Sequence, residues 1–253
     1  MSSPDANFQV NLLSGHKKAV NCLDVPHNGA STLATGSDDK TVRLWDTRNN
    51  RSSKAIAGFF TSSIGSLAFD AIQDYILYCS SGTSMFTVDL RMEAVLIRSP
   101  THSHIDLTRD DINCMTVHST GKYIAISDDN YDVTILSTEH PESVTHLQKK
   151  HTSIVGAIAF NPGISHELVT GGFDCIVSSC NFETMRTRST RNFSERSLVK
   201  QDASSSQYFN PPFVQGLAYI EDGQGLACAL GDGSVIQRFY GELDDRLSLI
   251  NST

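Results

Sequence analysis

Residues 33–48 read LATGSDDKTVRLWDTR, which is the pattern of two short strands joined by an acidic turn. The segments 33–35 and 41–45 are rich in the branched, apolar and aromatic residues that half-buried strands prefer. The segment 36–40 is predicted to turn, because aspartate tolerates left-handed backbone angles and hydrogen-bonds to neighbouring amides. The stretch therefore predicts a β-hairpin that ends in Trp45-Asp46.

Gly15-His16 precedes this hairpin, and the order GH, strands, aspartate turn and WD resembles the blade signature of the WD40-repeat family. The resemblance implies an all-β propeller of four-stranded blades, with a chain of hydrogen bonds inside the blade. In this series of hydrogen bonds, the indole of Trp45 donates to the hydroxyl of Thr35, which in turn contacts the imidazole of His16. The carboxylate of Asp39 orients the imidazole, so every buried polar group has a partner.

Composition limits the class of protein. The chain has 253 residues and a net charge of -8, which suits one propeller-sized domain and gives no support for direct nucleic-acid binding. Its six cysteines are far apart and form no C-x-x-C pair, which is typical of reduced core residues. Residues 1–10 show no secretory signal, and no apolar run reaches membrane-spanning length. We expect an intracellular protein, cytoplasmic or nuclear, with no membrane segment.

Weaker copies of the same unit follow along the chain. A second clear copy has His151, Thr170 and Asp174 at the network positions and Cys180 where the tryptophan should stand. The hydrogen-bond chain is truncated there, so a less rigid blade is expected. The whole chain is predicted to be one domain of about five recognisable blades, possibly an incomplete seven-bladed ring, with approximate bounds 8–50, 51–97, 98–140, 141–184 and 210–245.

Three segments do not fit this repeat pattern. Residues 8–13 (FQVNLL) alternate in polarity and are expected to supply the outer strand of the last blade, which would close the ring. Residues 98–111 are predicted to be a polar connector opening the third blade. Residues 185–209 are rich in Arg, Ser and Thr and poor in apolar residues, so they are predicted to be a disordered basic loop. A basic docking arm is the alternative for this last segment.

The sequence does not decide whether the blades close into a ring. Propellers of the family usually have seven blades, and an open arc would expose a sheet edge with unpaired backbone groups. Five blades therefore suggest a fragment or truncated form of a longer chain. The alternative is a tight ring of five blades, in which 8–13 pair beside 235–240.

Catalytic and metal sites are not predicted. The acidic pairs Asp38-Asp39 and Asp128-Asp129 are strand-turn residues, and neither they nor Asp110-Asp111 stand beside a recognisable nucleophile and base. His102 and His104 form an H-x-H pair in a polar stretch without an apparent third ligand, so a metal is not expected. Function should then reside in the blade edges, loops and faces.

One surface pattern points to a partner. Trp45-Asp46-Thr47-Arg48 closes the first blade and Val88-Asp89-Leu90-Arg91 closes the second, each with Arg two positions after Asp. Paired boxes of this kind resemble those of WD40 substrate receptors for cullin-4-type ubiquitin ligases. The resemblance implies that Trp45, Asp46, Arg48, Asp89 and Arg91 bind the damaged-DNA-binding-protein adaptor. Arginine suits such contacts because its planar fork makes several directional hydrogen bonds.

Two further runs support this hypothesis. Residues 110–136 and 149–162 resemble one group of WD-repeat proteins that is thought to act as such a receptor. The second box departs from the pattern, because Val88 replaces the aromatic residue. The alternative is a general WD40 scaffold, in which both arginines are ordinary solvated residues. The protein substrate cannot be named in either case.

Overall fold

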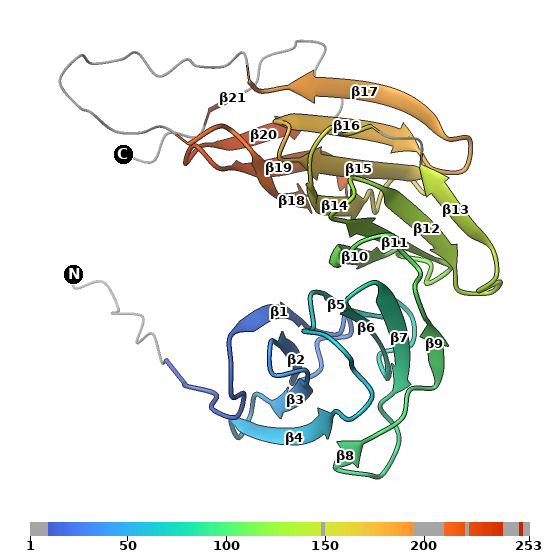
Figure 1. Cartoon of the computed structure of the whole chain (residues 1–253). Coiled ribbons are helices and arrows are strands. Elements are labelled where there is room, and N and C mark those ends of the chain that lie inside the picture. Colours follow the sequence, from blue (N-terminus) through green and yellow to red (C-terminus); the bar gives the residue numbers. More distant parts are fainter. Residues whose placement is uncertain (1–9, 148–149, 195–209, 221–222, 240–247, 250–253) are drawn as a thin grey trace, which may run out of the picture.

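The computed structural model describes residues 10–147, 150–194, 210–220, 223–239 and 248–249. Over these residues it contains β-strands and no α-helix. The strands form one five-stranded and four four-stranded sheets, which follow one another along an open arc (Figure 1). The prediction of an all-β fold built from four-stranded blades is confirmed.

Strands of one sheet are close together in the sequence. The first sheet contains β1 (Val20–Asp24), β2 (Thr32–Ser37), β3 (Val42–Asp46), β4 (Arg51–Ile56) and β8 (Leu96–Ile97). The second contains β5 (Leu67–Phe69), β6 (Ile76–Ser81), β7 (Ser84–Asp89) and β9 (His102–His104). The third contains β10 (Ile112–Val117), β11 (Tyr123–Asp128), β12 (Val133–Ser137) and β13 (Val144–Leu147).

The last two sheets have the same plan. The fourth contains β14 (Val155–Phe160), β15 (Glu167–Gly172), β16 (Ile176–Asn181) and β17 (Arg186–Asn192). The fifth contains β18 (Val214–Ile220), β19 (Gly225–Leu230), β20 (Val235–Phe239) and β21 (Ser248–Leu249). Neighbouring strands in all five sheets are antiparallel, except that β8 runs parallel to β4.

The first strand of four sheets has the same irregularity. The register with the second strand shifts between Val20 and Cys22 in β1, and at the matching place in β10, β14 and β18. Such a bulge bends the strand and increases its twist. Because the shift recurs, it identifies which residues are equivalent from one sheet to the next.

Apolar side chains pack between successive sheets. One cluster joins the first and second sheets, with Leu44 and Phe86 among its members, and a second cluster around Met85 and Ile112 joins the second and third. Two more clusters join the third sheet to the fourth and the fourth to the fifth. Each internal sheet is therefore covered on both faces by its neighbours, and the apolar side chains buried in these contacts stabilise the arc.

The predicted loop over 185–209 is wrong for its first part. Residues Arg186–Asn192 form β17, which pairs with β16 as the outer strand of the fourth sheet, eight residues beyond the predicted blade end at 184. All seven side chains are exposed. An outer strand is held by backbone hydrogen bonds along one edge and needs no apolar pattern, while Phe193 is buried just beyond it. Residues 195–209 lie outside the described part of the chain.

The predicted connector over 98–111 also contains a strand. His102–His104 form β9, the outer strand of the second sheet, and the short β8 just before it joins the first sheet. The third sheet in turn runs from Ile112 to Leu147, past its predicted end at 140. The strand bounds differ from the prediction because two- to four-residue outer strands have no polarity pattern of their own.

The predicted closing strand is not formed by the residues that the structure describes. Val10–Leu13 belong to no strand, and residues 8 and 9 lie outside the described ranges. The place beside β20 is taken by β21, which pairs Leu249 with Ile236. The pairing of residues 8–13 beside 235–240 is therefore corrected, and the first and fifth sheets stand at the two ends of the arc (Figure 1).

Candidate functional site: the blade networks and the Asp-x-Arg turns

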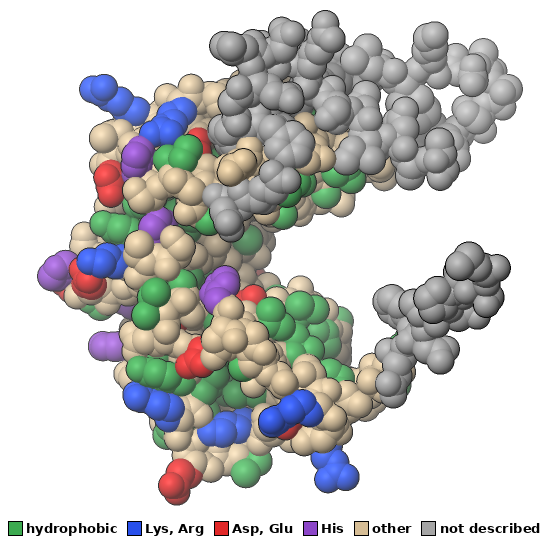
Figure 2. Space-filling model, turned by 180° about the vertical axis from the view of Figure 1, so that it is seen from behind, with side chains coloured by type: hydrophobic (Ala, Val, Ile, Leu, Met, Phe, Trp, Pro, Cys, Tyr) green, Lys and Arg blue, Asp and Glu red, His purple; other side chains and the backbone are tan. Residues whose placement is uncertain are grey.

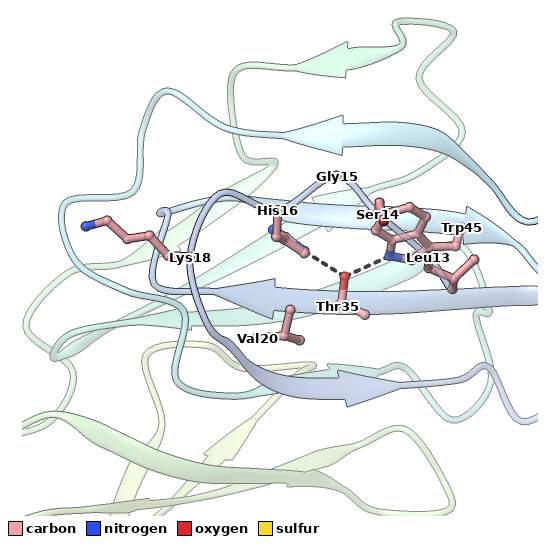
Figure 3. Close-up of a pocket in the computed structure, with 8 residues that line it drawn as sticks. All are labelled: Leu13, Ser14, Gly15, His16, Lys18, Val20, Thr35 and Trp45. Atoms are coloured by element: carbon pink, nitrogen blue, oxygen red, sulfur yellow. Dashed lines mark hydrogen bonds between the residues drawn. The ribbon is translucent and has the colours of Figure 1, made fainter. Parts of the chain in front are cut away.

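The four side chains predicted to form a network in the first sheet are joined by hydrogen bonds, and Figure 3 shows three of them, His16, Thr35 and Trp45. The indole Nε1 of Trp45 donates to Thr35 Oγ1 over 2.8 Å, and His16 Nε2 lies 2.8 Å from the same hydroxyl. His16 Nδ1 lies 3.1 Å from Asp39 Oδ2. Since the indole of Trp45 can only donate, Thr35 Oγ1 accepts that bond, and the same hydroxyl also serves His16 Nε2.

Asp39 is the charged end of this network. Partial burial raises the pKa of its carboxyl, but hydrogen bonds from the Thr41 hydroxyl, the Lys17 amide and His16 more than offset that effect and hold the pKa at about 2. Thr41 lies 2.6 Å from Asp39 Oδ1 and the Lys17 amide 2.8 Å from Oδ2. Thr41 is not among the residues predicted from the sequence, although its place two residues after Asp39 is a familiar turn-bonding position.

Gly15 of the GH pair permits this arrangement. A Cβ atom at that position would lie 2.9 Å from Trp45 Cη2, closer than carbon atoms approach one another. The absence of a side chain therefore lets the segment that carries His16 lie directly over the indole ring. Trp45 is 2% exposed as a result.

The fourth sheet repeats the network in shorter form. His151 Nε2 lies 2.8 Å from Thr170 Oγ1, and His151 Nδ1 lies 3.1 Å from Asp174 Oδ1. Cys180 pairs with Leu168 as Trp45 pairs with Leu33, so it occupies the tryptophan position. It donates only a weak hydrogen bond to the Leu168 carbonyl, with a sulfur-to-oxygen distance of 3.5 Å. The greater flexibility of this blade stays a prediction.

The two Asp-x-Arg turns have the same geometry. Arg48 Nε and Nη2 lie 2.9 and 2.8 Å from the two carboxylate oxygens of Asp46. Arg91 Nε and Nη2 lie 3.0 and 2.6 Å from the two oxygens of Asp89. Hydrogen bonds from the Arg48 side chain and backbone lower the pKa of Asp46 to about 2, and those from Arg91 lower the pKa of Asp89.

Both arginines are presented to solvent. Their side chains are 76% and 63% exposed, and neither Nη1 atom has a hydrogen-bond partner among the described residues. The guanidinium of Arg91 also lies over the ring of Tyr75, 3.8 Å from its centre. Trp45 was predicted to contact the adaptor with them. Its burial instead makes it a support for the turn, because it offers no surface to a partner.

A hollow of about 270 Å³ lies between the first and second sheets beside these turns. Pro26, Leu44, Tyr75, Leu90 and Arg91 are among the residues that line it. The Lys54 ammonium of β4 donates to the Leu90 carbonyl over 2.6 Å and ties the second turn to the first sheet. The second turn is therefore anchored to the first sheet through Lys54.

Other candidate groups have structural partners. Asp38 and Asp129 each accept a hydrogen bond of 2.7 Å from an asparagine of the neighbouring first strand, Asn21 and Asn113. Within the described ranges, no group of three His, Cys, Asp or Glu side chains is arranged to hold a metal ion. No helix in that part of the chain is long and apolar enough to cross a membrane.

Comparison with known proteins agrees with this geometry. Residues 7–46 match the family model described as "WD domain, G-beta repeat". The chain is 31% identical to the WD repeat-containing protein 53 homolog of Dictyostelium discoideum over 235 residues, which are 88% of this chain and 63% of that protein. It is 27% identical over 145 residues to cell division cycle 20.4, cofactor of APC complex, of Arabidopsis thaliana, covering 55% of this chain and 31% of that protein.

The chain thus spans less than two thirds of the length of either relative. The match at residues 7–46 falls on the segment that contributes the GH pair, the aspartate turn and the WD pair to the first network. The chain therefore contains a WD40 repeat at residues 7–46, continues with further blade-like sheets and is similar to WD-repeat proteins.

Proposed function

We propose that this WD40 protein is a substrate receptor of a cullin-4-type ubiquitin ligase, and that Arg48 and Arg91 bind the damaged-DNA-binding-protein adaptor. The observation that carries the proposal is the identical clamping of both arginines, by Asp46 and Asp89, on neighbouring sheets. The coarser function, a protein-interaction scaffold without catalytic chemistry, is general in the WD40 family.

The clamp prepares each arginine for binding. A free arginine side chain loses about 2 kcal/mol of rotamer entropy when it is fixed in an interface. Here the carboxylate already holds Nε and Nη2, so a partner gains the remaining Nη1 donors with less loss of entropy. Asp46 and Asp89 act as positioning residues in this proposal.

The charge of the surface suggests what the adaptor offers to it. Each Asp-Arg pair is neutral as a whole, so its outward donors suit backbone carbonyl oxygens better than they suit an acidic patch. The hollow beside Arg91 adds an apolar wall from Leu44 and Leu90, which suits a single apolar side chain of the same adaptor loop. Binding should therefore depend only weakly on salt concentration.

Binding of purified adaptor tests the proposal. Wild-type chain, the double variant Arg48→Ala/Arg91→Ala and the control Arg109→Ala would be compared, with circular dichroism on each. Arg109 is 78% exposed, as Arg48 is at 76%, and it also pairs with an aspartate, Asp132. Asp132 lies just before the start of β12, whereas Arg48 lies just after the end of β3. The control therefore removes an equally exposed arginine from the opposite end of the equivalent strand.

We expect the double variant to lose at least tenfold in affinity while Arg109→Ala binds as the wild type does. Truncating exposed arginines should leave the fold intact. Equal binding by all three folded proteins, or no binding by the folded wild type, would contradict the receptor hypothesis and leave the general scaffold.

A further inference from the structure

The outer strand of the fourth sheet differs from other outer strands in length and exposure. β17 has seven residues, all of them exposed, whereas the outer strands β9 and β13 have three and four residues. Short outer strands are one means by which sheets avoid unwanted pairing at their edges. Within the described ranges β17 therefore presents the longest outer edge, on the outer side of the arc (Figure 1).

This edge is open in the part of the chain that the structure describes, where no strand pairs with β17 on the side away from β16. Residues of an antiparallel strand direct their backbone groups alternately to either side, so about half of the amides and carbonyls of β17 point outward. The fourth sheet has a neighbour on both faces, through clusters that contain Cys180 and Val177. The open edge is therefore a property of this sheet and does not depend on how the arc ends.

The first sheet shows how such an edge can be filled. β4 is a polar strand at the same place in its sheet, and β8 lies along it in parallel. The Ala55 amide donates to the Val95 carbonyl over 2.8 Å, and the Ala57 amide donates to the Ile97 carbonyl over 3.0 Å. An outer edge of this chain therefore accepts a further extended segment through its backbone.

A bulge in β17 puts two arginines on one face of the strand. Three residues of β16 that are spaced two apart, and so share a face, pair with Arg191, Ser189 and Arg186. Arg188 is the extra residue of the bulge, and its Nη2 donates to His166 Nε2. Without the bulge Arg186 and Arg191 would point to opposite faces, because they are five residues apart.

The charge of this edge is opposite to the charge of the chain. Residues 186–194 contain three arginines and no aspartate or glutamate, in a chain of net charge -8. Within the described ranges neither Arg186 nor Arg188 forms an ion pair with a carboxylate. Figure 2 shows Lys and Arg side chains that project into solvent at the upper left, where the fourth sheet lies. Such an edge repels a second copy of itself and favours a strand with acidic side chains.

We infer that β17 binds an extended acidic peptide of a partner protein, which adds to the fourth sheet as a further strand. Backbone hydrogen bonds to the open edge hold the peptide, and carboxylates four residues apart in it meet Arg186 and Arg191. The side chain midway between those carboxylates lies beside Ser189. The site belongs to the fourth sheet and uses neither Arg48 nor Arg91.

Fluorescence anisotropy with a labelled peptide tests the inference. The probe has about eight residues of alternating threonine and glutamate, so that its glutamates share one face when it is extended. Wild type, Arg186→Ala/Arg191→Ala and the control Arg51→Ala/Arg109→Ala would be compared, with circular dichroism on each. The control removes the same charge from two exposed arginines, and its Arg51 lies in β4, whose outer edge β8 already occupies.

We expect the wild type and the control to bind the peptide with the same affinity, and Arg186→Ala/Arg191→Ala to lose about tenfold. Equal binding by the two double variants would overturn the inference, because the peptide would then not meet the arginines of β17. A folded wild type that does not bind the peptide would overturn it as well.

A second peptide separates strand addition from simple attraction between charges. Proline in place of every threonine keeps the charge of the peptide but removes amides that pairing with β17 needs. We expect the wild type to bind this peptide about tenfold more weakly than the first. Equal affinity for the two peptides, or for single-stranded DNA of the same charge, would refute strand addition and leave only general anion binding.

Hydrogen exchange on the unmodified chain locates the bound peptide without any substitution. Amides of Arg186–Asn192 should exchange more slowly when the threonine–glutamate peptide is saturating, because outward amides of β17 then donate to it. Amides of the outer strands β9 and β13 should not change. Protection of either of those strands in place of β17 would contradict the assignment.

Discussion

Thr35 is the residue through which the first-sheet network is connected. Its single hydroxyl accepts from Trp45 and serves His16, so it satisfies two ring nitrogens at once. Thr170 contacts the ring nitrogen of His151 alone, because Cys180 stands in the fourth sheet where Trp45 stands in the first. The same residue type at the same position therefore has different energetic weight in the two sheets.

Substitution of these residues should reveal that difference. Trp45→Ala should lower the free energy of unfolding by about 3–5 kcal/mol, since it leaves a cavity and unpairs Thr35. Thr35→Val should cost roughly 1–3 kcal/mol, because it leaves the buried indole N–H without an acceptor. Thr170→Val is the matched control and should cost less than Thr35→Val.

Urea unfolding followed by circular dichroism measures all three variants, since Trp45 is the single tryptophan and fluorescence is lost with it. A cost for Thr170→Val equal to or above that of Thr35→Val would show that the indole does not depend on the hydroxyl.

At the scale of the element, the close packing of one sheet on the next depends on small residues in the second strand. Gly171 of β15 lies against Val214 of the fifth sheet, and a Cβ there would fall 2.3 Å from Val214 Cγ1 and 2.9 Å from its Cβ. Val214 is fully buried and branched at Cβ, so it cannot rotate away. The fourth and fifth sheets can approach only because this position has no side chain.

Gly171→Ala should therefore separate these two sheets and cost about 1–3 kcal/mol of stability. Gly216→Ala is the matched control, because its added Cβ would lie an ordinary 3.6 Å from Ala229. Chemical denaturation of both variants measures the difference. Equal stabilities would mean that the backbone between the sheets relaxes without cost.

The outer strands are the elements whose bounds differ from those predicted from the sequence. First and second strands such as β14 and β15 are largely buried, and their runs of apolar residues predict them from the sequence. β9 and β17 carry mostly exposed polar residues, and their pairing is decided by the backbone edge of the neighbouring strand. A pattern of side chains cannot report a strand whose side chains all face water.

At the scale of the whole molecule, the arc has two ends with different environments from its middle. The first sheet packs on a sheet along one face only, and Val20, Leu23 and Val25 are exposed on its other face. Sheets in such linear arrays gain stability mainly from their nearest neighbours. The first sheet should then unfold before the third and fourth.

The single tryptophan lies in that sheet and makes the order of unfolding observable. In dilute solution the urea midpoint from Trp45 fluorescence should fall below the midpoint from circular dichroism, which reports all five sheets. Coincident midpoints in dilute solution would show that the five sheets unfold as one unit.

Local sequence patterns were enough to predict the repeat, the network of His16, Thr35, Asp39 and Trp45, and the turns in which Arg48 and Arg91 follow their aspartates. These features depend on residues near one another in the chain, where turn chemistry and strand alternation act directly. The burial of Trp45, the bond from Thr41 to Asp39 and the outer-strand positions of β9 and β17 could be seen only in the folded molecule. Those outcomes depend on which sheet lies against which, because packing and backbone pairing join residues far apart in the chain.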